Sequence, residues 1–211
     1  QNAINKYAKK VAFRGKNYAK DPQGTEAIVS KLTVAETKKY YQGILNRGKL
    51  LVVVVGDMDR ATLEEKLSGM LKKIPAGPPY NNKKEAYTPA KSSFSSTQKE
   101  FATNYIQGIT GAPLPGTPDF NAYQLAMAIF SSKHFLEVRS KNGLSYAPNA
   151  WFASGTTSVT NIAVYTTEPD KYVNVFNGLV TKLKKEGFSP EEVQNEKVSY
   201  VTGVYYRQET N

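Results

Sequence analysis

The sequence predicts an α+β fold in which antiparallel sheets are covered by helices. Three observations lead to this class. A continuous apolar, mostly β-branched run at Leu50–Val55 is typical of a central strand that is buried on both faces. Two further strands, 144–152 and 158–167, are expected to pair around a turn at Ser154-Gly155. Amphipathic stretches with helix caps stand between these strands, and no tight internal repeat is evident.

The composition excludes several kinds of site. The chain has 211 residues, a formal net charge of +10, one histidine and no cysteine. This length suits one large domain or two small ones. Without cysteine the chain has no thiolate zinc site and no thiol nucleophile, and with His134 alone most hydrolytic sites cannot be assembled. The run Leu50–Val55 is far shorter than the ~20 residues that span a bilayer, and residues 1–6 lack the apolar core of a signal peptide.

The first part of the chain predicts two capped helices around the apolar strand. A basic stretch at 7–24 comes before them and predicts a short helix followed by a loop. Thr33 and Glu36 have the spacing of a capping box, which starts a helix to about residue 46. Asp59 caps a second helix, with apolar residues on one stripe up to residue 71. In the first helix we expect four side chains to be buried: Tyr40, Tyr41, Ile44 and Leu45.

A change of composition predicts a boundary between two folded units. Pro75–Pro79 ends the second helix, and the residues up to 96 are polar with no apolar period. We therefore expect a first unit at 1–78, a linker at 79–96 and a second unit at 97–211.

The second unit predicts a strand, a helix, a strand pair and two more helices. Alternating residues from Phe101 to Gln107 indicate the first strand. Pro118 starts a helix through Phe130, and a separate short helix is expected at 133–141, ending at Asn142-Gly143. After the strand pair come two further helices, one beginning at Pro169 and one, capped by Ser189, from Pro190 to about Arg207.

Three features could indicate a metal or nucleic-acid site, and each has a simpler explanation. His134 and Glu137 match the start of a His-x-x-Glu-His zinc helix, but the second histidine is replaced by Val138, so we expect a histidine on a helix surface and no metal site. Asp57 and Asp59 could bind a metal, yet the role of Asp59 as a helix cap accounts for it. The basic residues are scattered among acidic ones, which favours a solvated surface over a nucleic-acid partner.

Arg139 and Tyr146 form the most informative pair. They are separated by a glycine turn, which can present a guanidinium and a phenol to one point. These groups are donors suited to a peptide carbonyl or a developing oxyanion. From the residues alone, the end of a helix followed by a half-buried tyrosine is the favoured explanation of the pair.

The segment around this pair resembles the second-half signature of M16 (insulinase/pitrilysin-like) zinc metallopeptidases. The signature has a helix with Leu or Phe, an arginine, a few polar residues and Gly-Leu-x-Tyr. Here it reads FLEVR at 135–139 and KNGLSY at 141–146. Further stretches resemble the family in order and spacing: GTEAI at 24–28, LT at 32–33, YY at 40–41, LVVVVGDMD at 51–59, PDFNA at 118–122, TTEP at 166–169, and SPEEV at 189–193 with Lys197.

The resemblance implies a fold, a role and two supporting residues. The fold would be similar to the LuxS/MPP-like metallohydrolase fold, with the tail of one α+β unit at 1–78 and the front of the next at 97–211. Arg139 and Tyr146 would orient the substrate and stabilise the oxyanion across a chamber from the zinc. The chain departs from the family pattern in lacking the His-x-x-Glu-His helix, and Phe130–Lys133 replaces the glycine-rich bend that commonly precedes the arginine helix.

These departures imply a fragment or a non-catalytic region of a larger protein. We expect no zinc and no peptidase activity in this chain alone, with Zn bound elsewhere in the complete peptidase. The implied partners are a peptide or unfolded polypeptide and the zinc-bearing half, either in the same chain or in a partner subunit. A purely structural M16-like scaffold subunit is the alternative. By analogy with bacterial relatives, the periplasm or cell envelope is the favoured location.

Overall fold

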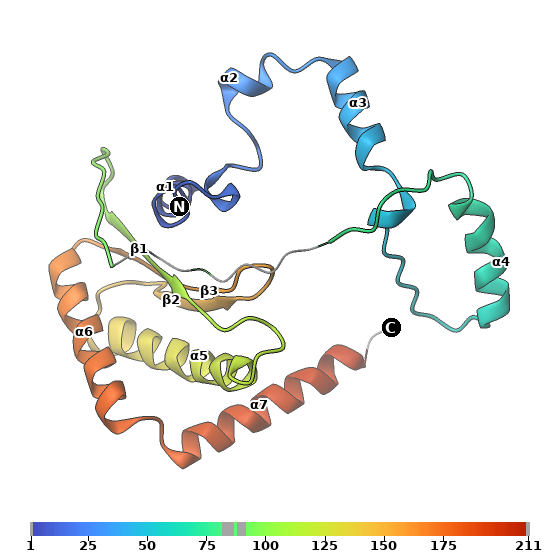
Figure 1. Cartoon of the computed structure of the whole chain (residues 1–211). Coiled ribbons are helices and arrows are strands. Elements are labelled where there is room, and N and C mark those ends of the chain that lie inside the picture. The colour runs from blue at the N-terminus through green and yellow to red at the C-terminus, as the bar shows by residue number, and fades with distance from the viewer. Residues whose placement is uncertain (1, 82–86, 88–91, 210–211) are drawn as a thin grey trace. The chain divides into compact units, whose positions relative to one another are not determined.

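A computed structural model describes residues 2–81, 87 and 92–209 of the chain (Figure 1). These residues divide into two compact units. Unit 1 comprises residues 2–21, 87 and 92–209, and unit 2 comprises residues 22–81. Half of the predicted linker at 79–96 falls outside the described residues.

Unit 1 contains a three-stranded antiparallel sheet in the order β1-β3-β2. The strands are β1 (Asn104–Gly111), β2 (Asn149–Ala153) and β3 (Val159–Thr166). The pairing of β2 with β3 was predicted and is confirmed, with Ala150 opposite Ile162. However, β2 begins at residue 149 and not at 144, because residues 142–148 form the connection from the preceding helix.

Some helices of unit 1 contact this sheet, and others pack on the helix or the turn that lies against it. They are α1 (Asn2–Ala12), α5 (Phe120–Phe135), α6 (Pro169–Glu186) and α7 (Pro190–Gln208), together with the short 3-10 helix Asn17–Ala19. Figure 1 shows α5 lying along one face of the sheet, while α1 contacts β1 from the other side. Most residues of β3, on both faces, are therefore buried, as expected for the central strand.

The predicted separate helix at 133–141 is wrong. Instead, α5 runs through residue 135 and continues directly into a π-helical turn, Leu136–Lys141. The predicted helix end at Asn142-Gly143 is confirmed, since Gly143 has a φ of +62°, the left-handed conformation of a glycine C-cap. Single π turns inside or after α-helices are uncommon, and they redirect the side chains that follow.

The core of unit 1 lies between the end of α5, the sheet and α6. Its central residues are Val138, Leu144, Val164 and Tyr172, which are all less than one-tenth exposed. Ile106, Val175 and Phe176 pack against this cluster. The turn that carries Arg139 is thus anchored by its own neighbour Val138, whose side chain is fully buried.

Unit 2 is built from short helices joined by extended chain. The elements are α2 (Glu26–Val29), α3 (Val34–Ile44), the 3-10 helix Arg47–Lys49 and α4 (Arg60–Leu71). Both predicted helix starts are confirmed: Thr33 and Glu36 form a capping box, and Asp59 accepts a hydrogen bond from the Thr62 amide.

Two predictions for unit 2 are wrong. Leu50–Val55 is extended but does not belong to a sheet among the described residues. The apolar residues of α3 are exposed, with Tyr40 at 72% and Tyr41 at 58%. The reason is the same in both cases, because no second layer covers these residues within the described part of unit 2.

The contacts also group α1 with unit 1, whereas the sequence suggested that residues 1–78 form one unit. The division into parts of two family units at 1–78 and 97–211 stays a prediction about the larger protein. None of the helices in the described ranges is both long and apolar enough to cross a bilayer.

The start of α7 offers a local test of this fold. The Ser189 hydroxyl accepts a hydrogen bond from the Glu192 amide, and the Glu192 carboxylate accepts one from the Ser189 amide. Glu192 also forms an ion pair with Lys133 of α5. We expect Ser189→Ala to lower the free energy of unfolding by about 1 kcal/mol, because an orphan amide loses its partner. Urea unfolding followed by the fluorescence of Trp151 measures this loss. Ser189→Asp, which keeps a capping oxygen, is the control, and equal stability of all three proteins would contradict the prediction.

Candidate functional site

Arg139 and Tyr146 lie against each other in the structure. The Arg139 guanidinium carbon is 4.2 Å from the centre of the Tyr146 ring and 5.1 Å from the centre of the Phe135 ring. A guanidinium stacked on aromatic rings is attracted by their negative faces and is held in one orientation. The two residues singled out from the sequence are therefore brought to one point, with Phe135 as a third member.

The local backbone explains why this pair forms. Gly143 adopts a left-handed conformation after the π-helical turn, and its amide donates to the Arg139 carbonyl at 3.0 Å. The next amide, of Leu144, donates to the Val138 carbonyl at 2.9 Å, and the Leu144 side chain is buried. The chain consequently reverses its direction sharply, which brings Tyr146 against Arg139.

The polar groups of the pair are available to a ligand. The Tyr146 side chain is 80% exposed, and Arg139 is partly exposed. Neither side chain forms a hydrogen bond or an ion pair with another described residue. The nearest carboxylate in the turn, Glu137, is paired with Lys141 at 2.8 Å. The guanidinium N–H groups and the phenol O–H are thus free donors, which suit a carbonyl oxygen or an oxyanion.

A shallow hollow adjoins the pair. It has a volume of about 450 Å³, and Phe135 lies both in its wall and against Arg139. The lining is part polar and part apolar. Its residues are Ser131, Ser132, Phe135, Leu136, Pro148 and Asn149.

Sequence reasoning missed two supporting residues. Phe135 stands four positions before Arg139, which places both on the same side of a helical turn, and this spacing could have indicated it. Asn142 donates from its side-chain amide to the Glu137 carbonyl at 2.8 Å and so closes the end of the π-helical turn. The latter bond depends on the π geometry, and no sequence pattern indicates it.

His134 is buried, and the prediction that it lies on a helix surface is wrong. Its side chain is fully inaccessible, stacks on Phe130 and shares a 3.1 Å hydrogen bond between Nε2 and the Tyr172 hydroxyl. Burial lowers the pKa of His134 to about 4, so the ring is neutral at pH 7. Burial also raises the pKa of the Tyr172 hydroxyl. The pair is a packed core contact and lies outside the exposed site.

The described residues contain no group of three or more His, Asp or Glu side chains that could hold a metal ion. Asp59, which was considered as a metal ligand, is engaged by the Thr62 amide and hydroxyl at the start of α4. These hydrogen bonds lower the pKa of the Asp59 carboxyl, as is usual for a helix cap.

Comparisons with known proteins place this geometry in context. A family model described as "Peptidase M16 inactive domain" matches residues 31–200. No curated protein sequence matches the chain. The fold is similar to a peptidase M16 inactive domain from Pseudomonas fluorescens, with a TM-score of 0.83 and 18% identity over 94% of this chain and 50% of that one.

Two other solved structures share the fold. A protease from Helicobacter pylori has a TM-score of 0.73 and 16% identity, over 94% of this chain and 51% of that chain. The periplasmic protease PqqL from Escherichia coli has a TM-score of 0.61 and 15% identity, over 97% of this chain and 24% of that chain. At these identities the likeness concerns the fold. The chain spans about half the length of the first solved chains that it matches.

Proposed function

Because the chain belongs to the family of M16 peptidase inactive domains, we propose that it is the substrate-binding, non-catalytic region of a zinc metallopeptidase. In this proposal the complete protein hydrolyses peptide bonds, and its zinc is bound by a half that lies outside this chain. The substrate is a peptide or an unfolded polypeptide. The observation that carries the proposal is the Arg139–Tyr146 contact, with its free donors beside an open hollow.

The proposed roles follow from the chemistry of the two side chains. Hydrolysis of a peptide places negative charge on the carbonyl oxygen as water adds to the carbon. The Arg139 guanidinium carries a fixed charge and a planar set of N–H groups, and Tyr146 adds one O–H donor. Stacking restrains both groups before the substrate arrives, so little reorganisation is needed when the charge develops.

In the complete protein, the zinc would polarise the substrate and activate a water molecule. The residues of this chain bind the substrate backbone and orient its carbonyl group. The two halves of the zinc peptidase can be parts of one chain or two subunits. We further propose that residues 1–78 and 97–211 belong to two consecutive α+β units of that protein.

We also propose that the complete protein works in the bacterial periplasm or cell envelope. The support is that one solved relative, PqqL from Escherichia coli, is a periplasmic protease. Immunoblots of periplasmic and cytoplasmic fractions test this location, and a protein confined to the cytoplasmic fraction would contradict it.

Peptide binding tests the proposed function apart from hydrolysis. The complete protein, with its zinc removed by a chelator, is titrated against a fluorescently labelled unfolded polypeptide, and the anisotropy is measured. We expect Arg139→Ala to raise Kd about tenfold or more, because a charge-assisted hydrogen bond contributes about 1.5–3 kcal/mol.

Lys141→Ala is the matched control for this titration. Lys141 carries the same charge on the same π-helical turn, but its ammonium group pairs with Glu137. We expect its Kd to stay within about twofold of the wild-type value. If Arg139→Ala also binds like the wild type, the scaffold alternative is favoured.

A further inference from the structure

The first 20 residues hold a large share of the positive charge of the chain. Six of its ten excess positive charges lie there with no acidic residue among them, whereas the rest of the chain mixes both signs. The helix dipole favours lysines in the last turn of α1, but it does not explain why the whole segment lacks an anion. Four of the six cations follow one another at helical spacing and are called the basic face: Lys6, Lys9, Lys10 and Arg14.

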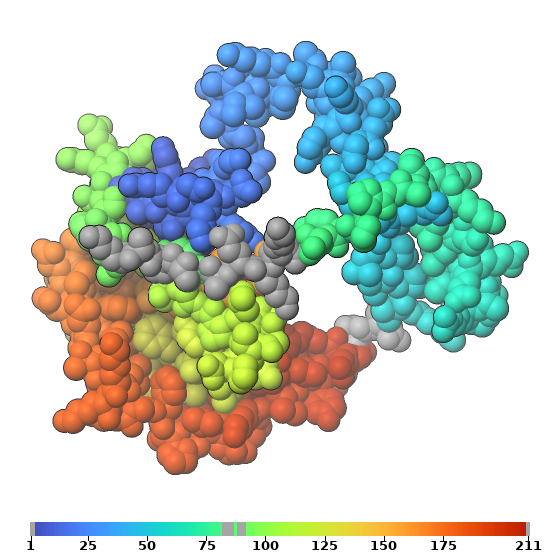
Figure 2. Space-filling view, in the orientation of Figure 1, coloured from blue at the N-terminus to red at the C-terminus, as the bar shows by residue number. Residues whose placement is uncertain are grey.

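The basic face points to solvent. Positions three and four apart lie on the same side of a helix, which makes Lys6 a neighbour of Lys9 and Lys10. Arg14 follows Lys10 by four positions, just beyond the last residue of α1. All four residues are exposed, and Figure 2 shows the atoms of α1, coloured dark blue, at the surface. Like charges at these spacings repel one another, so a bound anion would lower a repulsion that the free chain contains.

The opposite side of α1 holds the helix to unit 1. The helix contacts β1, and the Tyr7 hydroxyl donates a hydrogen bond to the Ser96 carbonyl at 3.0 Å. Phe13, directly after α1, is 5% exposed, and its ring centre lies 5.4 Å from that of Tyr18 and 5.0 Å from that of Tyr87. An anchored helix therefore presents the basic face, so its backbone needs little ordering when a ligand binds.

Most of the basic face lacks a counter-charge among the described residues. Lys6 forms an ion pair with Asp21 at 2.7 Å. Lys9, Lys10 and Arg14 form neither an ion pair nor a side-chain hydrogen bond with any residue that the structure describes. The charge that would complement this face can therefore come from an acidic ligand.

The spacing of the cations fits the carboxylates of an extended polypeptide. With a rise of 1.5 Å per residue, Lys6 and Lys10 are about 6 Å apart along the helix axis. In an extended chain, side chains two positions apart lie on the same side and are separated by about 7 Å. A segment with Asp or Glu at alternate positions can thus place one carboxylate at each turn of the basic face. The flexible lysine stems can accommodate the difference.

Two other anionic partners fit this face less well. Proteins that bind single-stranded nucleic acid stack bases on exposed aromatic rings. Within residues 2–20, Tyr18 is the only exposed aromatic residue, and its ring packs on Phe13. A helix that lies in a membrane surface inserts apolar side chains into the lipid, whereas Ile4 and Val11 lie on the partly buried side of α1.

We propose that the basic face of α1 is a second substrate contact, which binds an acidic, extended segment of an unfolded polypeptide. The inference rests on the proposed function, since the polypeptide is the substrate assigned there. The helices α1 and α5 contact the sheet from opposite sides (Figure 1), so this segment is distinct from the one bound at Arg139. The complete protein then prefers substrates with an acidic stretch, and long-range attraction speeds their capture.

Two matched peptides test the proposal on the complete protein, with its zinc removed by a chelator. One fluorescently labelled peptide alternates Glu and Ser, and the other has Gln in place of Glu. We expect the triple variant Lys9→Gln, Lys10→Gln, Arg14→Gln to raise Kd of the Glu peptide at least about fivefold, because three exposed charge contacts are lost. Its Kd for the Gln peptide should change less than about twofold. An unchanged Kd for the Glu peptide would overturn the proposal.

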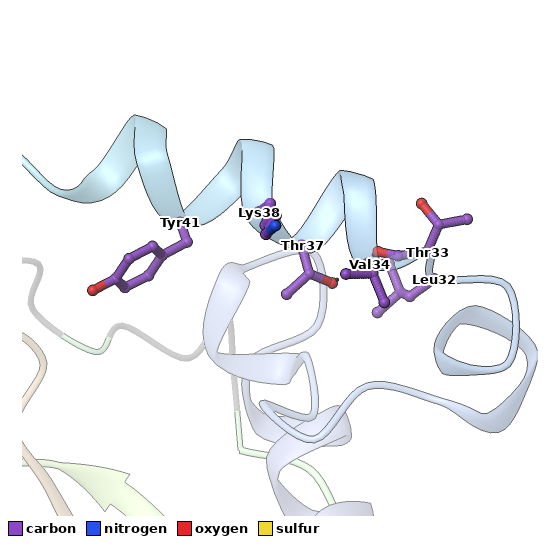
Figure 3. Close-up of a pocket in the computed structure, with 6 residues that line it drawn as sticks. All are labelled: Leu32, Thr33, Val34, Thr37, Lys38 and Tyr41. Carbon is purple, nitrogen blue, oxygen red and sulfur yellow. Dashed lines mark hydrogen bonds between the residues drawn. The ribbon is translucent and has the colours of Figure 1, made fainter.

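The triple variant Lys31→Gln, Lys38→Gln, Lys39→Gln is the matched control. These lysines are also exposed, they lie on or beside α3, which has 11 residues like α1, and their removal lowers the net charge equally. Figure 3 shows Lys38 at an open groove of about 400 Å³ on α3, where it is the only charged residue of the described lining. We expect Kd of the Glu peptide to stay within about twofold. An equal loss in both triple variants would overturn the proposal, because net charge alone would then attract the peptide.

Salt and two other ligands complete the test. Raising the ionic strength from about 0.1 M to about 1 M shortens the Debye length from about 10 Å to about 3 Å, so the preference for the Glu peptide should be lost. A preference that salt leaves unchanged would overturn the proposal. Tighter binding of an oligothymidylate or of phosphatidylglycerol vesicles than of the Glu peptide, abolished by the α1 triple variant, would also overturn it, in favour of nucleic acid or a membrane surface.

The outcome is separable from that of the proposed function. Arg139→Ala is expected to weaken the binding of both peptides, since its proposed partner is the peptide backbone, whereas the α1 triple variant weakens only the Glu peptide. If only the second effect is observed, the basic face binds acidic polypeptide and the role of Arg139 fails. If Arg139→Ala alone weakens binding, the proposal for the basic face fails and the substrate-binding role stands.

Discussion

Arg139→Ala is expected to lower kcat of the complete protein by about 100- to 1,000-fold if Arg139 has the proposed role, since this is the usual effect of removing one oxyanion donor. Arg139 supplies the fixed positive charge of the pair, and its N–H groups are not paired with any described residue. In the proposed role, Arg139 would stabilise a charge that is larger in the transition state than in the bound substrate, so kcat should fall more than KM rises. Steady-state hydrolysis of a quenched fluorescent peptide measures both constants.

Three further variants separate the contributions to this effect. Arg139→Lys keeps the charge but loses the planar stack between Phe135 and Tyr146, so we expect it to recover only part of the activity. Tyr146→Phe keeps the ring under the guanidinium and loses only the hydroxyl, which should produce a smaller fall than Arg139→Ala. Lys141→Ala is again the control. A wild-type kcat for Arg139→Ala, with folding intact, would show that the chain is a scaffold.

The free energy of unfolding of unit 1 is expected to fall by about 2 kcal/mol when the pH is lowered from 7 to 5. His134 is the cause, because burial lowers its pKa from 6.5 to about 4. Between these two values the unfolded chain binds a proton that the folded chain does not, so stability is full above pH 6.5 and is lost as the pH falls. Below about pH 4 both states are protonated and the loss levels off.

The expected change in unfolding free energy between pH 7 and pH 5 can be assigned to His134. It is the only histidine in the chain, and no other side chain ordinarily titrates in this interval. The capping carboxylates Glu36 and Glu192 have pKa values lowered chiefly by their hydrogen bonds, to Thr33 and Lys133 respectively, so their contribution is lost only in stronger acid.

Urea unfolding at several pH values, followed by the fluorescence of Trp151, measures this dependence. His134→Phe keeps an aromatic ring against Phe130 and Phe176 but cannot bind a proton. We expect the unfolding free energy of this variant to be flat between pH 7 and pH 5. A flat profile in the wild-type protein would contradict the buried, neutral state of His134.

The sequence predicted the helices of this chain well because their signals are local. Thr33 with Glu36 and Ser189 with Glu192 form the expected capping boxes, and the helix predicted to begin at Pro169 does so. The strand pair β2–β3 was also predictable, since a short turn joins two neighbouring runs.

The errors concern contacts that are distant in sequence. A strand at Leu50–Val55 needs partners, which the run itself cannot supply. The burial of His134 depends on Tyr172 and Phe176, which lie about 40 positions away in α6. Their approach is set by the packing of α6 on the end of α5, and the apolar pattern of α5 alone did not reveal it.

For the candidate site, the sequence indicated which residues to consider but not how they meet. The resemblance singled out Arg139 and Tyr146, and the structure places them in contact. The contact depends on a π-helical turn and on the left-handed Gly143, while the sequence predicted only an ordinary helix end. The contact of Phe135 with Arg139 differs, because its spacing of four positions could have indicated it from the sequence.

The proposal that this chain supports hydrolysis without performing it is tested most directly by one paired measurement. Zinc content and peptide turnover are determined for the complete protein and for this chain alone, under identical conditions. We expect one zinc ion and measurable turnover in the complete protein, with neither in the isolated chain. Stoichiometric zinc or turnover in the isolated chain, or a complete protein with no turnover, would contradict the claim.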